Sequence, residues 1–99
     1  MPSLTVAAIQ VGSDNGKPDD NLRRAEAWVR QAARQRATLV LCPEFLATGY
    51  AYDESIWDCG EALGGRTESW LTRMSSECQI YLAAGFLESD GTDFFNTVS

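Results

Sequence analysis

Apolar residues occur along this chain in two patterns, continuous runs and a period of three to four residues, which predict alternating strands and helices. Residues 4–11 and 38–42 are almost continuously apolar, which is typical of strands whose sheet is covered on both faces. Between them, residues 20–35 carry apolar side chains at three- and four-residue steps, as one buried face of a helix requires. This face consists of Leu22, Ala25, Val29, Ala32 and Ala33. A strand, a helix and a strand within about 40 residues predict two parallel strands joined by a right-handed crossover.

Local signals mark where the first helix begins and where the second strand ends. Pro18 suits the first helical turn, and the carboxylates of Asp19 and Asp20 there face the positive end of the helix dipole. Pro43 has no amide hydrogen to donate to a neighbouring strand, so we expect the second strand to end there.

The second half of the chain is predicted to hold one more helix and two more strands. The helix covers residues 67–79, and the third strand covers residues 80–88. Residues 89–93 carry Asp-Gly at their centre, which predicts a hairpin turn. Residues 94–99 are then expected to begin a fourth strand.

Residues 45–65 fit neither pattern, because glycines interrupt them. We expect a long loop here, with a short helical piece near residues 53–57. The helix after the loop has an apolar face, formed by Trp70, Leu71, Met74 and Cys78.

Composition and charge exclude several classes of protein. Of the 99 residues, 44% are apolar and 22% charged, as in an ordinary globular domain. The net charge of −6 argues against binding to nucleic acid or to an anionic membrane, both of which need clustered Lys and Arg. The apolar run at the N-terminus is too short for a signal peptide or a membrane span. A cytoplasmic location is therefore expected.

The cysteine and histidine counts limit the chemistry. The chain has three cysteines with no C-x-x-C pair, and no histidine. A disulfide framework, a metal site of the usual zinc type and a Ser-His-Asp triad are therefore not expected within it.

Glu44 is the strongest candidate for chemistry. It follows a buried strand directly, and in open α/β sheets ligands bind at the carboxyl ends of the strands. We expect Phe45 and Leu46 to remove water from the carboxylate, which favours its use as a general base. Taken alone, however, a Glu after a proline at a strand end is more often a solvated loop residue.

The residues around Glu44 allow two interpretations. Cys42 would point to the same side as Glu44 if the strand stayed regular, but a small buried residue is the commoner role of a free cysteine. Phe45 and Tyr50 are candidates for a substrate pocket, as are Tyr52 and Trp57, although aromatic side chains in a long loop also serve to pack it onto the sheet.

The remaining cysteines have no motif around them. Cys78 lies on the apolar face of the second helix, where packing is expected, whereas Cys59 falls in the loop and its exposure is open.

Five segments in order carry a recognisable pattern: L-T-V-A-A-I-Q (residues 4–10), Asn21 with the helix after it, L-V-L-C-P-E-F-L-A-T-G-Y (39–50), I-Y-L-A-A-G (80–85) and F-N-T-V (95–98). Together they resemble the N-terminal part of the nitrilase superfamily of carbon–nitrogen hydrolases. We expect Asn96 and Thr97 in the last segment to shape a strand turn rather than to contact a substrate.

The resemblance implies a nitrilase-like α-β-β-α sandwich, a layered α/β fold. Residues 1–99 would supply about four strands and two helices of one half, as the N-terminal portion of a single domain that continues beyond them. Homo-oligomers, commonly dimers, are implied as well.

The resemblance also implies an activity, the hydrolysis of nonpeptide carbon–nitrogen bonds in small amides, nitriles or N-carbamoyl compounds without metal or cofactor. A Cys nucleophile, a Glu general base and a Lys carry it out in this family. Glu44 occupies the Glu position, whereas the Cys and Lys positions lie beyond this chain, and its only lysine, Lys17, stands elsewhere.

A different class of function stays open. Without the Cys and Lys the chain would be a non-catalytic remnant or an interaction module. It would then self-associate through the sheet face that the helices leave bare.

Overall fold

The computed structural model describes residues 3–50 and 54–99. The predicted α/β class is confirmed. In chain order the elements are β1 (Val6–Ala8), α1 (Pro18–Arg34), β2 (Leu39–Leu41), the 3₁₀ helix η1 (Glu54–Cys59), α2 (Arg66–Cys78), β3 (Tyr81–Ala83), β4 (Gly85–Ser89) and β5 (Phe94–Val98).

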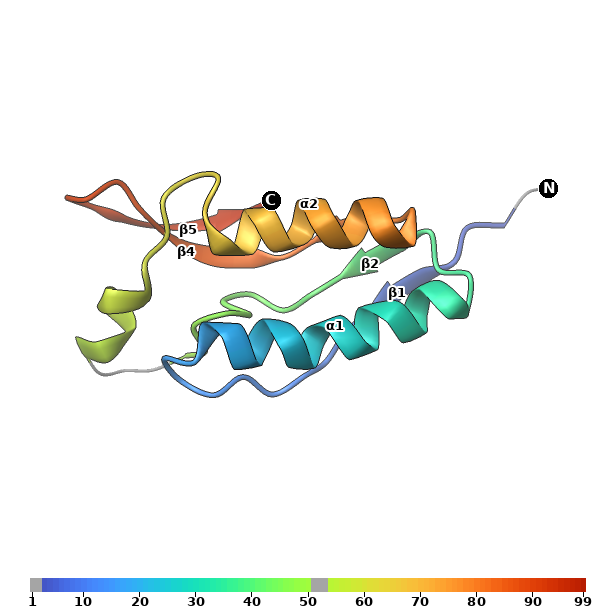
Figure 1. The fold of residues 1–99 in the computed structure, drawn as a ribbon, viewed down its shortest axis with the longest axis horizontal. Coiled ribbons are helices and arrows are strands. Elements are labelled where there is room, and N and C mark those ends of the chain that lie inside the picture. Colours follow the sequence, from blue (N-terminus) through green and yellow to red (C-terminus); the bar gives the residue numbers. More distant parts are fainter. Residues whose placement is uncertain (1–2, 51–53) are drawn as a thin grey trace.

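Three short strands form a parallel sheet in the order β1-β2-β3. The predicted strand–helix–strand unit is therefore confirmed, with α1 as the crossover between β1 and β2. Figure 1 shows α1 and α2 on the same face of the sheet, where they run side by side. Strand β2 ends at Leu41, and the last ladder bond runs from the Cys42 amide to the carbonyl of Ala83 at 2.8 Å. The strand thus stops before Pro43, as predicted.

The prediction of one continuous strand over residues 80–88 was wrong, because the chain changes partner at Ala84. Up to Ala83 it pairs with β2, whereas Ala84 exchanges two backbone hydrogen bonds of 3.0 Å with Ser99. From Gly85 onward the chain pairs with β5 as an antiparallel hairpin. The physical reason is that β2 has already ended, so the extended chain beyond Ala83 must satisfy its backbone groups elsewhere.

The predicted hairpin turn is confirmed between β4 and β5. The Asp90 carboxylate accepts hydrogen bonds from the backbone amides of Thr92 at 2.9 Å and Asp93 at 2.7 Å. Gly91 has a φ of 94°, a conformation that glycine adopts without strain.

The hydrophobic core lies between the two helices and the sheet. The apolar faces predicted for both helices are buried there, except that Ala33 and Cys78 are only partly buried. The buried members of the core are Leu22, Ala25, Val29, Ala32, Ala37, Val40, Leu46, Ala47, Trp70, Leu71, Met74 and Ala84.

The end of the long loop is fixed by Glu61, which the sequence did not single out. Its backbone bonds to Leu87 and Ser89, and so ties the loop to β4. Its buried carboxylate accepts hydrogen bonds of 2.5 Å from the amide and the hydroxyl of Thr67. Glu61 thereby caps the first turn of α2.

The face of the sheet opposite the helices carries exposed apolar side chains. In the parallel register Val6, Leu39 and Tyr81 are paired and point to the same side, while Val40 points into the core. Val6 is 49% exposed, Leu41 42% and Tyr81 74%. This open face matches the bare sheet face expected from the sequence.

We predict that residues 1–99 expressed alone self-associate at micromolar concentrations, because burial of the open face removes apolar surface from water. Tyr81→Lys should weaken the association, since it places a charge on that face in place of its most exposed large side chain. Sedimentation velocity distinguishes the states. A monomer at all accessible concentrations would contradict the prediction.

Candidate functional site

Glu44 lies at the carboxyl end of β2 with both carboxylate oxygens in hydrogen bonds. The hydroxyl of Tyr50 donates to Oε2 at 2.8 Å, and the side-chain amide of Asn96 donates to Oε1. These partners come from the loop after β2 and from β5, 52 residues away along the chain. The carboxylate is therefore held in one orientation rather than left free at a strand end.

The expected desolvation of Glu44 was wrong. Glu44 is exposed, and Leu46 turns into the core instead of covering the carboxylate. Phe45 is half-buried and packs edge-on against Tyr50, with ring centroids 5.5 Å apart. Within this chain, hydrogen bonds rather than an apolar cover define the environment of Glu44.

A sharp turn after Glu44 makes this arrangement possible. Phe45 has a φ of 49°, in the left-handed region that a bulky side chain rarely adopts. Such a conformation costs about 1–3 kcal/mol and persists only where its surroundings impose it. The Gly49 amide closes the turn with a 2.8 Å bond to the Phe45 carbonyl. The turn directs Glu44 outward while the next residues enter the core.

Gly85 lets strand β4 pass close behind Glu44. A Cβ atom on Gly85 would lie 3.1 Å from Cα of Glu44, which is tighter than ordinary van der Waals contact. The Gly85 carbonyl also accepts a 3.4 Å bond from the Leu46 amide. Glycine at this position therefore allows the carboxylate to sit directly beside the hairpin.

Asn21 holds the loop that carries Glu44. Its side chain is buried in the first turns of α1, where Oδ1 accepts from the Asp14 amide and Nδ2 donates to the carbonyls of Asp14 and Ala47, each at 2.7 Å. Two further bonds join the same loops, from Ser13 Oγ to the Leu46 carbonyl at 2.7 Å and from the Gly16 amide to the Thr48 carbonyl at 3.0 Å.

Sequence reasoning missed the part played by two asparagines. Asn96 and Thr97 do not shape a turn, since both lie within β5, and Thr97 bonds to Glu88 at 2.7 Å. The fold alone brings Asn96 to Glu44. For Asn21 a signal existed, because a polar residue next to Leu22 on the buried side of a helix needs internal partners.

Of the other predicted pocket residues, one lies at the site and one lies elsewhere. Tyr50 joins the site through its bond to Glu44. Trp57 instead packs against Phe94 of the hairpin, with centroids 4.7 Å apart. Tyr52 lies outside the described residues.

In the described part of the chain, Glu44 is hydrogen-bonded to Tyr50 and Asn96 and to no cysteine. Cys42 packs against the core, and burial raises the pKa of its thiol to about 12. Cys78 is likewise packed against the core, and Cys59 is half-buried. The packing roles expected for Cys42 and Cys78 are confirmed.

Residues 3–50 and 54–99 contain neither a metal-binding cluster nor a membrane-spanning helix. No cluster of His, Cys, Asp or Glu in this part of the chain is arranged to hold a metal ion. None of the helices described there is long and apolar enough to span a membrane.

The family of the chain follows from a comparison with family models. Residues 5–99 match the model for carbon–nitrogen hydrolases. The chain belongs to the carbon–nitrogen hydrolase family. The resemblance inferred from the five sequence segments is thereby confirmed.

Named relatives in this family include amidases and nitrilases. The chain is 30% identical over 97 residues to a nitrilase of Pyrococcus abyssi, with 95% of this chain and 37% of that protein aligned. It is 34% identical over 100 residues to an omega-amidase of Mus musculus, and 26% identical over 95 residues to a 2-oxoglutaramate amidase of Bacillus subtilis. These alignments cover 100% and 95% of this chain, respectively, and 36% of each relative. The chain therefore spans about a third of the length of these relatives.

Solved structures share the fold. A CN-hydrolase superfamily protein from Xanthomonas campestris superposes with a TM-score of 0.85 at 20% identity, over 99% of this chain and 36% of that one. An amidase from Nesterenkonia sp. gives 0.78 at 21% identity, over 96% and 36%. The predicted fold is confirmed as part of the carbon–nitrogen hydrolase fold.

We predict that Asn21→Ala lowers the free energy of unfolding by roughly 2–3 kcal/mol, because backbone groups of Asp14 and the buried carbonyl of Ala47 lose their partner. Urea denaturation of the whole protein measures the change. Gln31→Ala on the exposed side of the same helix is the matched control and should change stability little. Equal effects of the two substitutions would contradict the role of Asn21.

We predict that Cys42 resists alkylation in the folded protein. Only the thiolate reacts, and a pKa raised from 9.0 to about 12 lowers the thiolate fraction at pH 8 by roughly a thousandfold. The same raised pKa makes unfolding easier as pH rises from the unfolded-state pKa towards 12, because only the unfolded thiol ionises in that range.

Mass spectrometry after iodoacetamide treatment, with and without urea, tests the predicted resistance of Cys42 to alkylation. Equal labelling rates in the two conditions would refute it.

Proposed function

We propose that this chain is the N-terminal portion of a single-domain hydrolase that cleaves small-molecule amides, and that Glu44 is its general base. The observation that carries the proposal is the fixed orientation of the Glu44 carboxylate at the carboxyl end of β2, between Tyr50 and Asn96. The names of the relatives support an amide as substrate, since they include an omega-amidase and a 2-oxoglutaramate amidase.

The hydrogen bonds leave Glu44 able to take up a proton. Each carboxylate oxygen has two lone pairs, and each accepts one described hydrogen bond, from Tyr50 or from Asn96. Both donors hold the carboxylate in one orientation. A positioned carboxylate of this kind meets the geometric requirement for a general base once a substrate or nucleophile is brought beside it.

The proposed reaction follows the family resemblance. Glu44 removes the proton from a cysteine thiol in the remainder of the protein, and the thiolate attacks the amide carbon to form a tetrahedral intermediate. A lysine stabilises the charge that develops on oxygen. Glu44 then returns the proton to the departing nitrogen, which leaves as ammonia or an amine. Water, activated by the same carboxylate, hydrolyses the remaining thioester.

The test is Glu44→Gln in the whole protein, assayed by ammonia release from small amides. Turnover should fall by about 10²- to 10⁴-fold or more, the usual contribution of a general acid–base group. Stability should stay nearly unchanged, because Glu44 is exposed and glutamine retains hydrogen-bonding capacity. Asn96→Ala should give a smaller loss of turnover, since it frees one oxygen of the carboxylate without removing it.

Glu77→Gln is the matched control. It makes the same chemical change on α2, where Glu77 pairs with Arg30 and Arg73 on the surface. It should leave turnover intact. Wild-type turnover in Glu44→Gln, with the wild-type melting temperature, would refute the assignment of Glu44.

The open face of the sheet supports a second candidate function, a non-catalytic interaction module that self-associates. Its basis is the exposure of Val6, Leu41 and Tyr81 on one face. The amidase assay distinguishes the two candidate functions. If the whole protein is a non-catalytic module, it releases no ammonia from amides, and Glu44→Gln changes nothing in the assay.

A further inference from the structure

The loop over residues 44–50 has two ends that meet at the Glu44 carboxylate. The middle of the loop is anchored in the core by three buried residues, Leu46, Ala47 and Thr48. The Gly49 amide donates to the Phe45 carbonyl at 2.8 Å and closes the loop. Glu44 and Tyr50 therefore stand at the two ends of a frame that the core holds in place.

The backbone is in the left-handed region at both ends of this loop. Gly49 has a φ of 76°, and a Cβ atom there would lie 2.6 Å from Oδ1 of Asn15, so glycine is the residue that fits. Phe45 has a φ of 49° although a bulky side chain disfavours this conformation. Strain that is kept at a residue with a large ring points to a task for that ring.

The ring of Phe45 packs against the ring of Tyr50. Their centroids are 5.5 Å apart and their planes meet at 70°, the edge-to-face arrangement that aromatic pairs prefer. Tyr50 is 55% exposed, so burial does not hold its side chain in one rotamer. The contact with Phe45 restricts the directions in which Tyr50 can point.

The Tyr50 hydroxyl is in turn hydrogen-bonded to Glu44. It donates to Oε2 at 2.8 Å, whereas the side chain of Asn96 donates to the other oxygen from β5. Phe45, Tyr50 and Glu44 thus form a chain of contacts within one loop. This loop holds Oε2 without help from the hairpin.

We propose that Phe45 is a positioning residue for the general base and that it acts through Tyr50. The ring of Phe45 keeps the Tyr50 hydroxyl at Oε2, and this hydrogen bond keeps the Glu44 carboxylate aimed at the proton that it removes. A misplaced carboxylate slows proton transfer, because the rate depends on the geometry of the reacting groups. This role rests on the function proposed for Glu44.

The test compares kcat and KM of the whole protein for a small amide with those of two variants. Tyr50→Phe removes only the hydroxyl and should lower kcat about tenfold, the usual weight of one hydrogen bond to a charged group. Phe45→Leu keeps an apolar side chain but removes the ring, and should lower kcat roughly threefold. KM should stay within about twofold in both variants, because the lost contacts orient the base rather than bind the substrate.

The double variant shows whether Phe45 acts through Tyr50. If the ring serves to place the hydroxyl, Phe45→Leu has no further effect once Tyr50→Phe has removed that hydroxyl, and the loss stays at about tenfold. Independent roles would multiply to a loss of about thirtyfold. Phe45→Tyr retains a ring and should lose less turnover than Phe45→Leu.

Trp28→Leu is the matched control, because it removes an exposed aromatic ring from α1, outside the loop. It should leave kcat and KM unchanged. Turnover is expressed per folded molecule, with the folded fraction taken from the melting curve, so that a loss of stability is not counted as a loss of catalysis. If Phe45→Leu does not fold, Phe45→Met takes its place.

Three kinetic outcomes would overturn the role of Phe45. They are wild-type kcat in Tyr50→Phe, wild-type kcat in Phe45→Leu, and a double variant whose loss equals the product of the single losses. Each of them leaves the role of Glu44 intact as long as Glu44→Gln is inactive. Wild-type turnover in Glu44→Gln would instead reject Glu44 as the base, and the role of Phe45 with it.

Crystal structures of the whole wild-type protein and of Phe45→Leu give a readout that needs no turnover. The Tyr50 hydroxyl should lie at Oε2 of Glu44 in the wild type and turn away from it in the variant. A hydroxyl that stays bonded to Glu44 without the Phe45 ring would also overturn the role of Phe45.

Discussion

The buried side chain of Asn21 is the contact on which the rest of the candidate site depends. Its amide joins the start of α1 to two loops at once, through Asp14 and Ala47. Without it, the backbone groups at these positions would lose these hydrogen bonds, and the carbonyl of Ala47 is buried. The same clamp supports the left-handed conformation of Phe45, because that strain needs a rigid frame. The orientation of Glu44 thus depends on the packing of α1 against the loop that follows β2.

The change of strand partner at Ala84 also determines the surroundings of Glu44. Because the chain leaves β2 and pairs with β5, the hairpin runs past the end of the parallel sheet, where Gly85 touches Glu44. Asn96 lies on the returning strand and so meets the carboxylate from the other side. A single continuous strand over residues 80–88 would not bring β5 to this edge. The change of partner at Ala84 therefore brings both Gly85 and Asn96 to Glu44.

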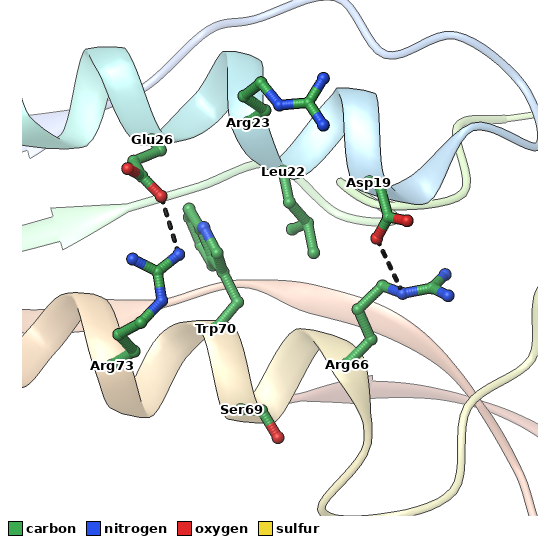
Figure 2. A pocket seen from close by; sticks show the side chains of 8 residues that line it. All are labelled: Asp19, Leu22, Arg23, Glu26, Arg66, Ser69, Trp70 and Arg73. Carbon is green, nitrogen blue, oxygen red and sulfur yellow. Dashed lines mark hydrogen bonds and ion pairs between the residues drawn. The ribbon is translucent and has the colours of Figure 1, made fainter.

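The two faces of the sheet have different characters. The helical face is closed by the core and is crossed by ion pairs between α1 and α2 (Figure 2). The other face is apolar and open, in a chain that spans about a third of its named relatives.

Much of the fold was readable from the sequence, because local chemistry and apolar rhythm specify it. Pro18 starts α1 as predicted, the buried stripes of both helices are where the spacing put them, and Asp-Gly turns the hairpin. The family could be read as well, since short motifs stand in order along the chain. Glu44 stood out because its place after a buried strand is a local feature.

Only the tertiary structure revealed the contacts between residues that are far apart in the sequence. No local pattern tells that Asn96 meets Glu44, that Ala84 exchanges partners, or that Trp70 is buried among arginines of two helices. Even the exposure of Glu44 differed from expectation, because it depends on which way Phe45 turns the chain. Apolar rhythm fixes which side of an element is buried, whereas contacts between elements depend on how they pack together in space.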